Sequence, residues 1–404
     1  MKLVVKIVVK FVLSLALLAI PSISLVTACS SRNLRPHFQN EHTSFGKNGS
    51  DLSGHEVLER SWTYSIDPVS SSQGLGPMEY VTPVLTENTL LFGSGRFGLV
   101  SLYPKIERPR WKIEIPNGIV SQIEIQGAEA YFTGGDGNVY SIELETGKTL
   151  WTYALRNPVS SRPTVDGGEL YVVTSDDAVV CLESKTGKWL WHYRRRNISG
   201  PTIHGASSPL VVGDAIWVGF ADGTLVSLSR KDGKVLWEKR LNTNKRFSNL
   251  NASFLKFDHL VYVPAYDNAL YALDEKTSAP VWIKDNIGGS KKVSVVDNIL
   301  YAPTSNGYLY ALEAKTGKEI WHFELDSGIA SDVVVTPQHV IIGSSSEFLY
   351  ALERNTGKLV YRFQIGFGSG FSGGLAFDPI RNYLYALSRG GNLLSFTYHP
   401  QAKR

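Results

Sequence analysis

Two glycine-rich segments in this chain of 404 residues have the spacing of motifs that carry chemistry. Residues 93–98, Gly-Ser-Gly-Arg-Phe-Gly, fit the fingerprint that binds a dinucleotide pyrophosphate, and residues 370–374, Gly-Phe-Ser-Gly-Gly, fit a serine-nucleophile pattern. Both motifs function where a strand leads into a helix. Here the first continues into residues 99–103, which read as another strand, and the second lies in a glycine-rich connection. We therefore expect neither nucleotide binding nor nucleophilic catalysis at these segments.

The histidines give no indication of a metal site. There are nine, they are scattered singly, and no His-x-x-x-His pair occurs. His192 and His322 each follow a recurring Trp, so we expect both to be partly exposed strand residues. Paired acids that meet across loops are invisible in a sequence, and that alternative stays open. We expect no metal and no other cofactor.

A cysteine after a hydrophobic leader is the clearest chemical signal. Lysines precede an apolar run at residues 11–20, which leads into residues 25–29, Leu-Val-Thr-Ala-Cys. This order is typical of a bacterial lipoprotein, with residues 1–28 as signal peptide and lipid on Cys29. An ordinary signal peptide that contains a cysteine is the alternative. Multiple acyl chains anchor a protein stably, and the two serines after Cys29 favour the periplasmic face of the outer membrane over inner-membrane retention.

Without residues 1–28 the charge of the chain is nearly balanced. The whole chain has 41 Lys and Arg against 37 Asp and Glu, and the leader removes three Lys, which leaves 38 against 37. The pI of about 8.8 therefore gives no indication of a nucleic-acid partner. Residues 29–56 are poor in large apolar side chains and predict a flexible tether, whereas residues 57–404 predict one domain. Cys181, in an alternating strand, is expected to pack as a small core residue.

A pattern of about 40 residues occurs eight times and determines the expected fold. It consists of a polar turn, an alternating apolar strand, an acidic residue, a Thr-Gly-Lys turn and a Trp, and residues 310–321 are its clearest copy. A period of this length with several strands per unit is typical of a β-propeller, each unit being one blade. The apolar residues that end the repeated strand have spacings of 40, 40, 46, 45, 39, 40 and 44: Leu102, Ile142, Leu182, Leu228, Leu273, Leu312, Leu352 and Phe396.

Each repeat predicts four short antiparallel strands and no helix. In the sixth repeat the strands are expected at residues 292–296, 299–303, 308–313 and 319–324, joined by turns rich in Asn and Gly. A large aromatic residue recurs on the last strand, where we expect it to wedge against the neighbouring blade. These residues are Trp62, Trp111, Trp151, Trp191, Trp237, Trp282, Trp321 and Tyr361.

The repeats do not begin and end with complete blades at the two ends of the chain. Trp62 precedes the first complete set of inner strands, and no outer strand with a Trp follows Phe396. We therefore expect residues 58–66 to supply the outer strand of the last blade. The predicted fold is an all-β, eight-bladed propeller of four-stranded antiparallel blades, closed by this N-terminal strand, so that no gap remains in the ring.

The pattern Ala-x-(Asp/Glu)-x-x-Thr-Gly-Lys-x-x-Trp resembles the repeat of quinoprotein-type propellers. It differs from WD40 repeats, because no recurring Trp is followed by Asp. With the lipoprotein signal, the whole chain resembles the BamB family of outer-membrane assembly lipoproteins. That resemblance implies a non-catalytic scaffold, monomeric within a complex, which binds the periplasmic POTRA domains of a BamA-like barrel protein.

Two connections are the expected binding loops, because in that family loops entering blades four and five bear the contacts. The first corresponds to residues 202–209, with His204 where Arg is usual. The second corresponds to residues 246–251, with Asn249 and Asn251 where Asp is usual. Independently of the family, the repeat spacing lengthens to 46 and 45 at these two steps, and such insertions commonly mark a docking face.

Apolar residues lie in both connections, and basic residues lie beside them. Protein interfaces often combine apolar anchors with such a basic rim. The apolar residues are Ile203, Phe247 and Leu250, and the basic residues are Arg194, Arg195, Arg196, Lys239, Arg240, Lys245 and Arg246. A solvated, charged loop rim is the bland alternative. Two other functions stay open: an envelope lipoprotein that binds polysaccharide or peptide, and a quinone-dependent dehydrogenase. The dehydrogenases usually carry adjacent cysteines, which this chain lacks.

Overall fold

The computed structural model describes residues 56–66, 81–155, 157, 159, 161–195, 207–241, 249–266, 269–290, 292–365, 370–371 and 373–403. All of them belong to one compact unit, Phe38–Arg404. The regular elements in these ranges are strands, with no α-helix among them. Accordingly, this part of the chain offers no helix with the length and apolarity needed to cross a bilayer.

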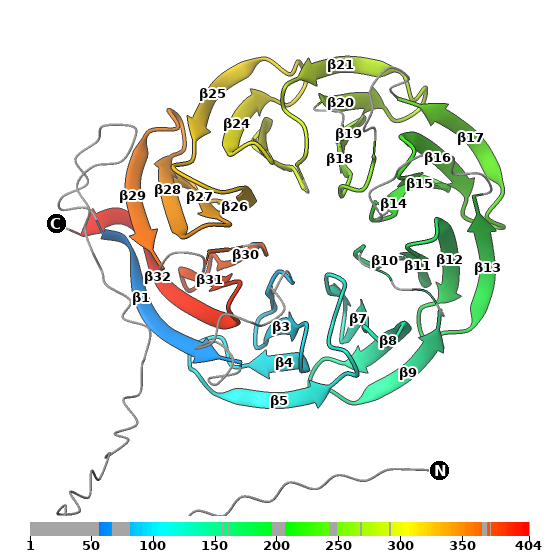
Figure 1. The fold of residues 1–404 in the computed structure, drawn as a ribbon, viewed down its shortest axis with the longest axis horizontal. Helices are drawn as coiled ribbons and strands as arrows, with labels where there is room; N and C mark the ends of the chain where they lie inside the picture. Colours follow the sequence, from blue (N-terminus) through cyan, green and yellow to red (C-terminus); the bar gives the residue numbers. More distant parts are fainter. Residues whose placement is uncertain are drawn as a thin grey trace, which may run out of the picture. The chain divides into compact units, whose positions relative to one another are not determined.

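Eight four-stranded antiparallel sheets stand around a central axis, which confirms the predicted eight-bladed propeller (Figure 1). We number the blades 1 to 8 in chain order of their innermost strands. Blades 1 to 4, from the axis outward, are as follows: β2 (Val84–Leu85), β3 (Leu90–Ser94), β4 (Gly98–Leu102), β5 (Pro109–Glu114); β6 (Glu124–Gln126), β7 (Glu129–Thr133), β8 (Asn138–Glu143), β9 (Thr149–Ala154); β10 (Thr164–Asp166), β11 (Glu169–Val173), β12 (Ala178–Glu183), β13 (Trp189–Arg194); β14 (Leu210–Val212), β15 (Ala215–Gly219), β16 (Thr224–Ser229), β17 (Val235–Arg240).

Blades 5 to 8 follow the same order, except that the outermost strand of blade 8 comes from the start of the chain. Their strands are β18 (Leu255–Phe257), β19 (Leu260–Pro264), β20 (Ala269–Asp274), β21 (Pro280–Asp285); β22 (Ser294–Val296), β23 (Ile299–Pro303), β24 (Tyr308–Glu313), β25 (Glu319–Glu324); β26 (Ala330–Val335), β27 (His339–Ser344), β28 (Phe348–Glu353), β29 (Leu359–Gln364); β30 (Leu375–Asp378), β31 (Tyr383–Leu387), β32 (Asn392–Lys403), β1 (Glu56–Ser65).

The predicted strands of blade 6 agree with the structure except at one end. The first strand begins at Ser294 rather than Lys292. Lys292 instead forms a parallel bridge with Ser253 of blade 5 and belongs to the connection between the two blades. The other three strands have the predicted bounds.

The ring is closed by β1, as the sequence predicted. It pairs with β32 from Glu56 opposite Lys403 to Ser65 opposite Asn392. The strand starts two residues earlier than expected, because β32 continues to Lys403 and offers partners there. Side-chain contacts add to this seam: the hydroxyl oxygens of Ser61 and Thr397 lie 2.8 Å apart.

The core lies between neighbouring sheets, and the recurring Trp links one blade to the next. A Trp ring lies against the glycine of the next blade's Thr-Gly-Lys turn, and a Cβ added at Gly357 would be 2.5 Å from the ring of Trp321. Its indole N–H donates to a carbonyl at that turn, as from Trp321 to Arg354 at 3.0 Å. The expected wedge is therefore confirmed, and we call this arrangement the Trp–Gly lock.

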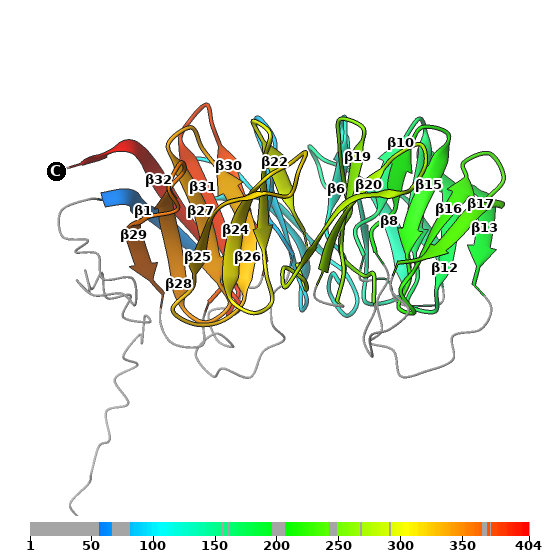
Figure 2. The ribbon, with the colours of Figure 1, turned by 90° about the horizontal axis from the view of Figure 1, so that it is seen from above.

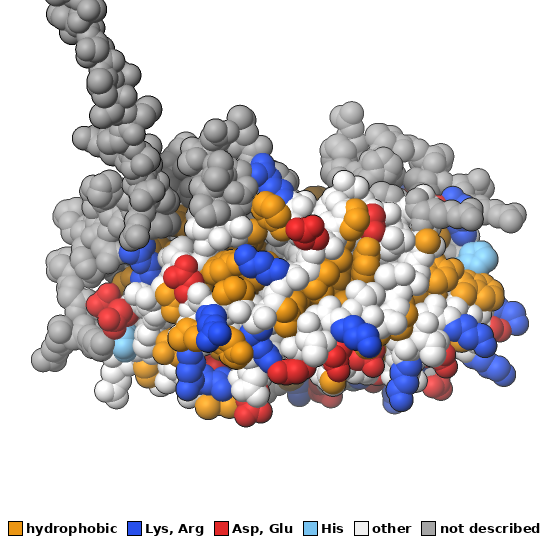
Figure 3. Space-filling model, turned by 90° about the horizontal axis from the view of Figure 1, so that it is seen from below, with side chains coloured by type: hydrophobic (Ala, Val, Ile, Leu, Met, Phe, Trp, Pro, Cys, Tyr) orange, Lys and Arg blue, Asp and Glu red, His pale blue; other side chains and the backbone are white. Residues whose placement is uncertain are grey.

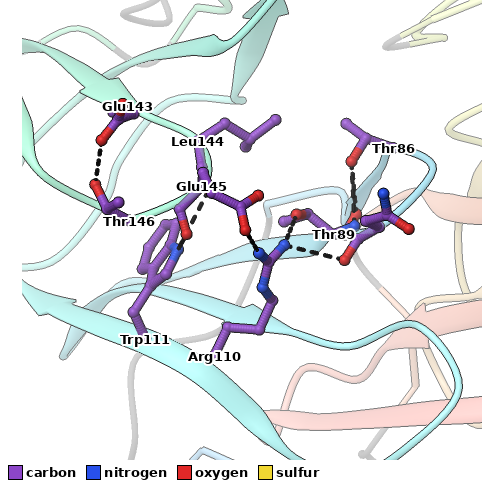
Figure 4. A network of polar contacts seen from close by, with 9 residues as sticks. Thr86, Thr89, Arg110, Trp111, Glu143, Leu144, Glu145 and Thr146 are labelled. Carbon is purple, nitrogen blue, oxygen red and sulfur yellow. Dashed lines mark hydrogen bonds and ion pairs between the residues drawn. The ribbon is translucent and has the colours of Figure 1, made fainter.

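Figure 4 shows the lock between blades 1 and 2, where a second side chain reinforces it. Trp111 donates to the carbonyls of Leu144 and Glu145 at 3.2 and 3.1 Å. Arg110 reaches both the Thr89 hydroxyl and the Glu145 carboxylate from the same strand. The guanidinium thus fastens the outer strand of blade 1 to the turn of blade 2.

Three joints depart from this pattern. Between blades 7 and 8 the recurring residue is Tyr361, whose hydroxyl donates to the Leu58 carbonyl at 2.8 Å. Between blades 4 and 5 the turn carries Ser278 in place of glycine, and within the described chain the Trp237 indole has no hydrogen-bond acceptor; its ring instead meets the edge of Trp217, 4.9 Å between centroids. Between blades 8 and 1 the buried Trp62 Nε1 likewise lacks an acceptor among the described residues. Among the described residues, the blades pack at all three joints without an indole N–H bond.

Replacing Ser278 by Gly is expected to stabilise the protein. Ser278 has φ of 54°, a left-handed conformation that costs a side-chain-bearing residue about 1 kcal/mol and costs glycine little. The midpoint of urea unfolding should therefore rise. Ser305→Gly is the matched control, since Ser305 is an exposed turn residue without positive φ; there the midpoint should fall slightly. A lower midpoint for Ser278→Gly would contradict this account.

Candidate partner-binding face

One face of the propeller carries all connections from an outer strand to the next inner strand, and we call it the loop face. The first residue after an outer strand donates its N–H to the turn between the second and third strands of its own blade. Examples are Leu155 to Gly137, Leu241 to Gly223 and Leu325 to Gly307, at 3.0, 3.2 and 2.9 Å. The chain therefore leaves every such blade on the same side, as the arrows of β13 and β29 in Figure 2 illustrate, and both lengthened connections start from this face.

Arg195, at the start of the connection into blade 4, is bound within the propeller. Its guanidinium donates to Asp222 at 2.9 Å, to Glu238 at 2.8 Å and to Thr224 at 3.1 Å, and its side chain is only 15% exposed. Burial acts to lower its pKa, but the hydrogen bond to Glu238 and the charge of Asp222 outweigh this and raise it. Arg195 thus fastens blade 3 to blade 4.

Two more of the expected basic residues also have internal partners. Arg194 pairs with Asp176 at 2.6 Å, and the Lys239 ammonium donates to the Ser278 carbonyl of blade 5 at 2.8 Å. Arg240 is exposed on the rim. The acidic partners of these residues were not singled out from the sequence, because they lie 18 to 43 positions away. Of these residues, Arg195 and Lys239 join neighbouring blades, whereas Arg194 is paired within blade 3.

The second connection returns to the ring through residues that lie in the interior. Asn249 and Leu250 are 2% and 1% exposed. The Leu250 N–H donates to the Phe220 carbonyl at 3.1 Å, and the Asn249 carbonyl accepts from Tyr266 at 3.0 Å, so this segment bridges blades 4 and 5. Asn251 is half-buried. Asn249 and Leu250 therefore shape the loop face from beneath and present no accessible side chain in this conformation.

The remaining candidates fall outside the described residues. They are Arg196, Ile203, His204, Lys245, Arg246 and Phe247, together with the lipidation candidate Cys29. Their expected roles stay predictions.

The two glycine-rich motifs are turns and connections, as expected. Residues 93–98 link β3 directly to β4. In the second motif the N–H of Phe371 donates to the Ser344 carbonyl at 2.7 Å, and its ring is fully buried. Gly374 donates to the Thr82 hydroxyl at 2.9 Å, which ties blade 8 to blade 1. Both segments therefore have structural roles; Ser372 itself is outside the described residues.

The other reactive side chains have the expected surroundings. Cys181 is fully buried, and burial, with a smaller contribution from Glu169, raises the pKa of its thiol to about 12. His192 and His322 are exposed on outer strands. Among the described residues no three His, Cys, Asp or Glu side chains gather as metal ligands would.

Comparison with solved structures finds the same architecture in proteins of several kinds. The crystal structure of BamB from Moraxella catarrhalis aligns with a TM-score of 0.70 at 17% identity, covering 85% of this chain and 100% of that one. The computationally designed Ika8 protein gives 0.67 at 14% identity, with coverages of 86% and 100%. Quinohemoprotein alcohol dehydrogenase ADHIIG from Pseudomonas putida HK5 gives 0.67 at 12% identity, with coverages of 87% and 78%. At such identities the likeness concerns the fold alone.

Sequence comparison is more specific. No curated protein sequence matches the chain significantly. The family profile described as "Outer membrane protein assembly factor BamB" matches three overlapping stretches, residues 47–154, 126–321 and 267–396, which together span nearly the whole propeller. The chain therefore belongs to the BamB family of outer membrane protein assembly factors.

Proposed function

We propose that this protein is a lipid-anchored, non-catalytic scaffold of the machinery that assembles outer-membrane β-barrels. The single observation that carries the proposal is the family match between residues 47 and 396. A closed ring with blades fastened by Trp–Gly locks suits a scaffold, because it fixes the relative positions of the strands from which its loops start.

The proposed partner is the POTRA region of a BamA-like barrel protein, bound at the loop face through the connections into blades 4 and 5. Ile203 and Phe247 would supply apolar anchors, while Arg196, Lys245 and Arg246 would steer an acidic surface toward them. His204 and Asn251 complete the proposed contact. Leu250 and Asn249 are left out of the contact because they are buried.

The proposed location is the periplasmic face of the outer membrane. Residues 1–28 would be removed, Cys29 would carry the lipid, and residues 29–56 would connect it to the propeller.

Replacing Ile203 and Phe247 together by Asp is expected to abolish co-purification with the BamA-like protein from detergent-solubilised envelopes. Two carboxylates would have to be buried in the interface without partners, which costs several kcal/mol. Ile329→Asp is the matched control, since Ile329 is 47% exposed in the connection into blade 7, also on the loop face. It should leave co-purification intact. Leu250→Asp would be a poor test, because it would unfold the joint between blades 4 and 5.

Undiminished co-purification of the double variant would rule out these loops as the docking site. Circular dichroism and the urea midpoint, unchanged from the parent protein, would show that the propeller is still folded. Failure of the parent protein to capture any barrel protein would count against the proposed function itself.

A further inference from the structure

The outer strands of blades 3 and 4 expose apolar side chains in pairs. On β13 the pairing with β12 slips by one residue between Trp189 and Trp191, so this β-bulge turns Trp189 and Leu190 outward together. Their exposed fractions are 47% and 38%. The same bulge on β17 exposes Val235 and Leu236, at 44% and 56%.

The repeat usually has an apolar residue at the second of these positions but not at the first. Blades 1, 2, 5, 6, 7 and 8 have the following pairs there: Pro109-Arg110, Thr149-Leu150, Pro280-Val281, Glu319-Ile320, Leu359-Val360 and Arg60-Ser61. Only blade 7 has two large aliphatic residues among these, and there Leu359 is 3% exposed, in contact with the region of β1. Blades 3 and 4 therefore differ from the others in exposing a large apolar residue at the first position as well, Trp189 and Val235.

The two apolar pairs are neighbours, with a basic turn between them. Gly233 of blade 4 lies against the ring of Trp191 in blade 3, so the turn that contains it is placed between the pairs. That turn carries Lys231 and Lys234, and the turn before Trp189 carries Lys185 and Lys188; all four are exposed.

The acidic residues of these turns only partly balance the lysines. They are Glu183, which accepts from the Thr186 hydroxyl, and Asp232, which pairs with Lys234 at 2.7 Å. We define the patch as the two apolar pairs and the four lysines; with Glu183 and Asp232 counted against the lysines, an excess of two positive charges remains.

We propose that this rim patch rests on the surface of a bilayer that contains anionic headgroups. Trp with adjacent aliphatic residues is typical of side chains at the membrane interface, and lysines beside them attract anionic lipids, each contributing roughly fivefold in affinity. The rim of a propeller is convex, so a flat surface touches about two adjacent blades, and the patch spans two. Figure 3 views the rim from the side of β5 and β9, in blades 1 and 2, where hydrophobic and basic side chains also lie next to one another.

This inference goes beyond the proposed scaffold role, because it requires no POTRA partner. A lipid on Cys29 would add to it, since an anchored surface meets the bilayer at high effective concentration and even a weak patch is then occupied. The patch itself consists entirely of described residues.

Vesicle flotation tests the proposal with the chain from Cys29 onward, carrying Cys29→Ser so that no lipid is attached. The protein should float with vesicles of phosphatidylcholine and phosphatidylglycerol, and less with phosphatidylcholine alone or at high salt. The double variant Trp189→Ser with Leu236→Ser should bind at least about tenfold more weakly. Leu150→Ser with Ile320→Ser is the matched control, since these exposed bulge residues lie on blades 2 and 6, and should bind like the parent protein.

Three results would overturn the proposal: no flotation with anionic vesicles, equal binding to both kinds of vesicle, or equal binding by the Trp189/Leu236 variant. Loss of barrel-protein capture by that variant without change in flotation would assign the patch to a protein partner instead. The Ile203/Phe247 variant should still float, which separates this test from that of the scaffold function. Unchanged circular dichroism and urea midpoints show that each variant is folded, because the altered side chains are exposed.

Discussion

Replacing Trp191 by Ala is expected to destabilise the propeller by about 3–5 kcal/mol, the range for a buried Trp. The ring is 6% exposed, packs against Gly233 and Tyr171, and donates its N–H to the Arg230 carbonyl at 2.7 Å. Removing it leaves a cavity between blades 3 and 4 and an unpaired carbonyl. The midpoint of guanidinium unfolding, followed by circular dichroism, should fall strongly.

Two comparisons separate the packing of the ring from its hydrogen bond. Trp191→Phe keeps most of the apolar contact and loses the N–H, so it should cost about 1–3 kcal/mol. Trp237→Ala should cost less than Trp191→Ala, because Trp237 is half-buried and has no acceptor for its indole among the described residues. Equal losses at Trp191 and Trp237 would show that the Trp–Gly lock adds nothing to ordinary burial.

A disulfide between Ser61→Cys and Thr397→Cys is expected to form on oxidation and to stabilise the ring by up to about 5 kcal/mol. The two hydroxyl oxygens are 2.8 Å apart across the β1–β32 seam, so the replacing sulfurs start close together. The crosslinked residues are 336 positions apart, and the entropy lost by the unfolded chain rises with this separation. The unfolding midpoint of the oxidised protein should rise, and reductant should reverse the gain.

The disulfide also tests the closure itself. Cys29→Ser removes the other accessible thiol candidate, and Cys181 should not interfere, because it is fully buried with its pKa raised to about 12. The reduced double variant is the control and should unfold like the parent, since both sites are on the exposed side of the seam. If no crosslink formed in the native protein, the paired N-terminal strand would be in question.

Much of this fold could be predicted because each repeat contains sequence signals for strands and turns that act between residues close together in the chain. Alternating apolar residues specify short strands, and Asn and Gly supply the positive φ of tight turns. Because Trp62 precedes the first complete blade, the eight repeats require an N-terminal strand to complete the last blade. In the structure β1 is that strand. The recurring aromatic residue could be recognised as a wedge from its regular position alone.

The candidate site was less predictable, since burial depends on neighbours far along the chain. Leu250 looked like a loop anchor, yet it packs beside Gly219 of the preceding blade. Arg195 looked like a free basic residue, yet it forms ion pairs with Asp222 and Glu238 of blade 4. Nothing within a single repeat indicates these partners.

The sequence by itself therefore determined the blades, their number and the way the ring is sealed, because strand alternation and turn residues act within a few positions. Only the tertiary structure decided which side chains of a connection are buried, which joints lack the Trp–Gly lock, and that the bulge pairs of blades 3 and 4 lie exposed next to one another. These features depend on how one sheet meets the next, and that contact joins residues that the repeat places about 40 positions apart.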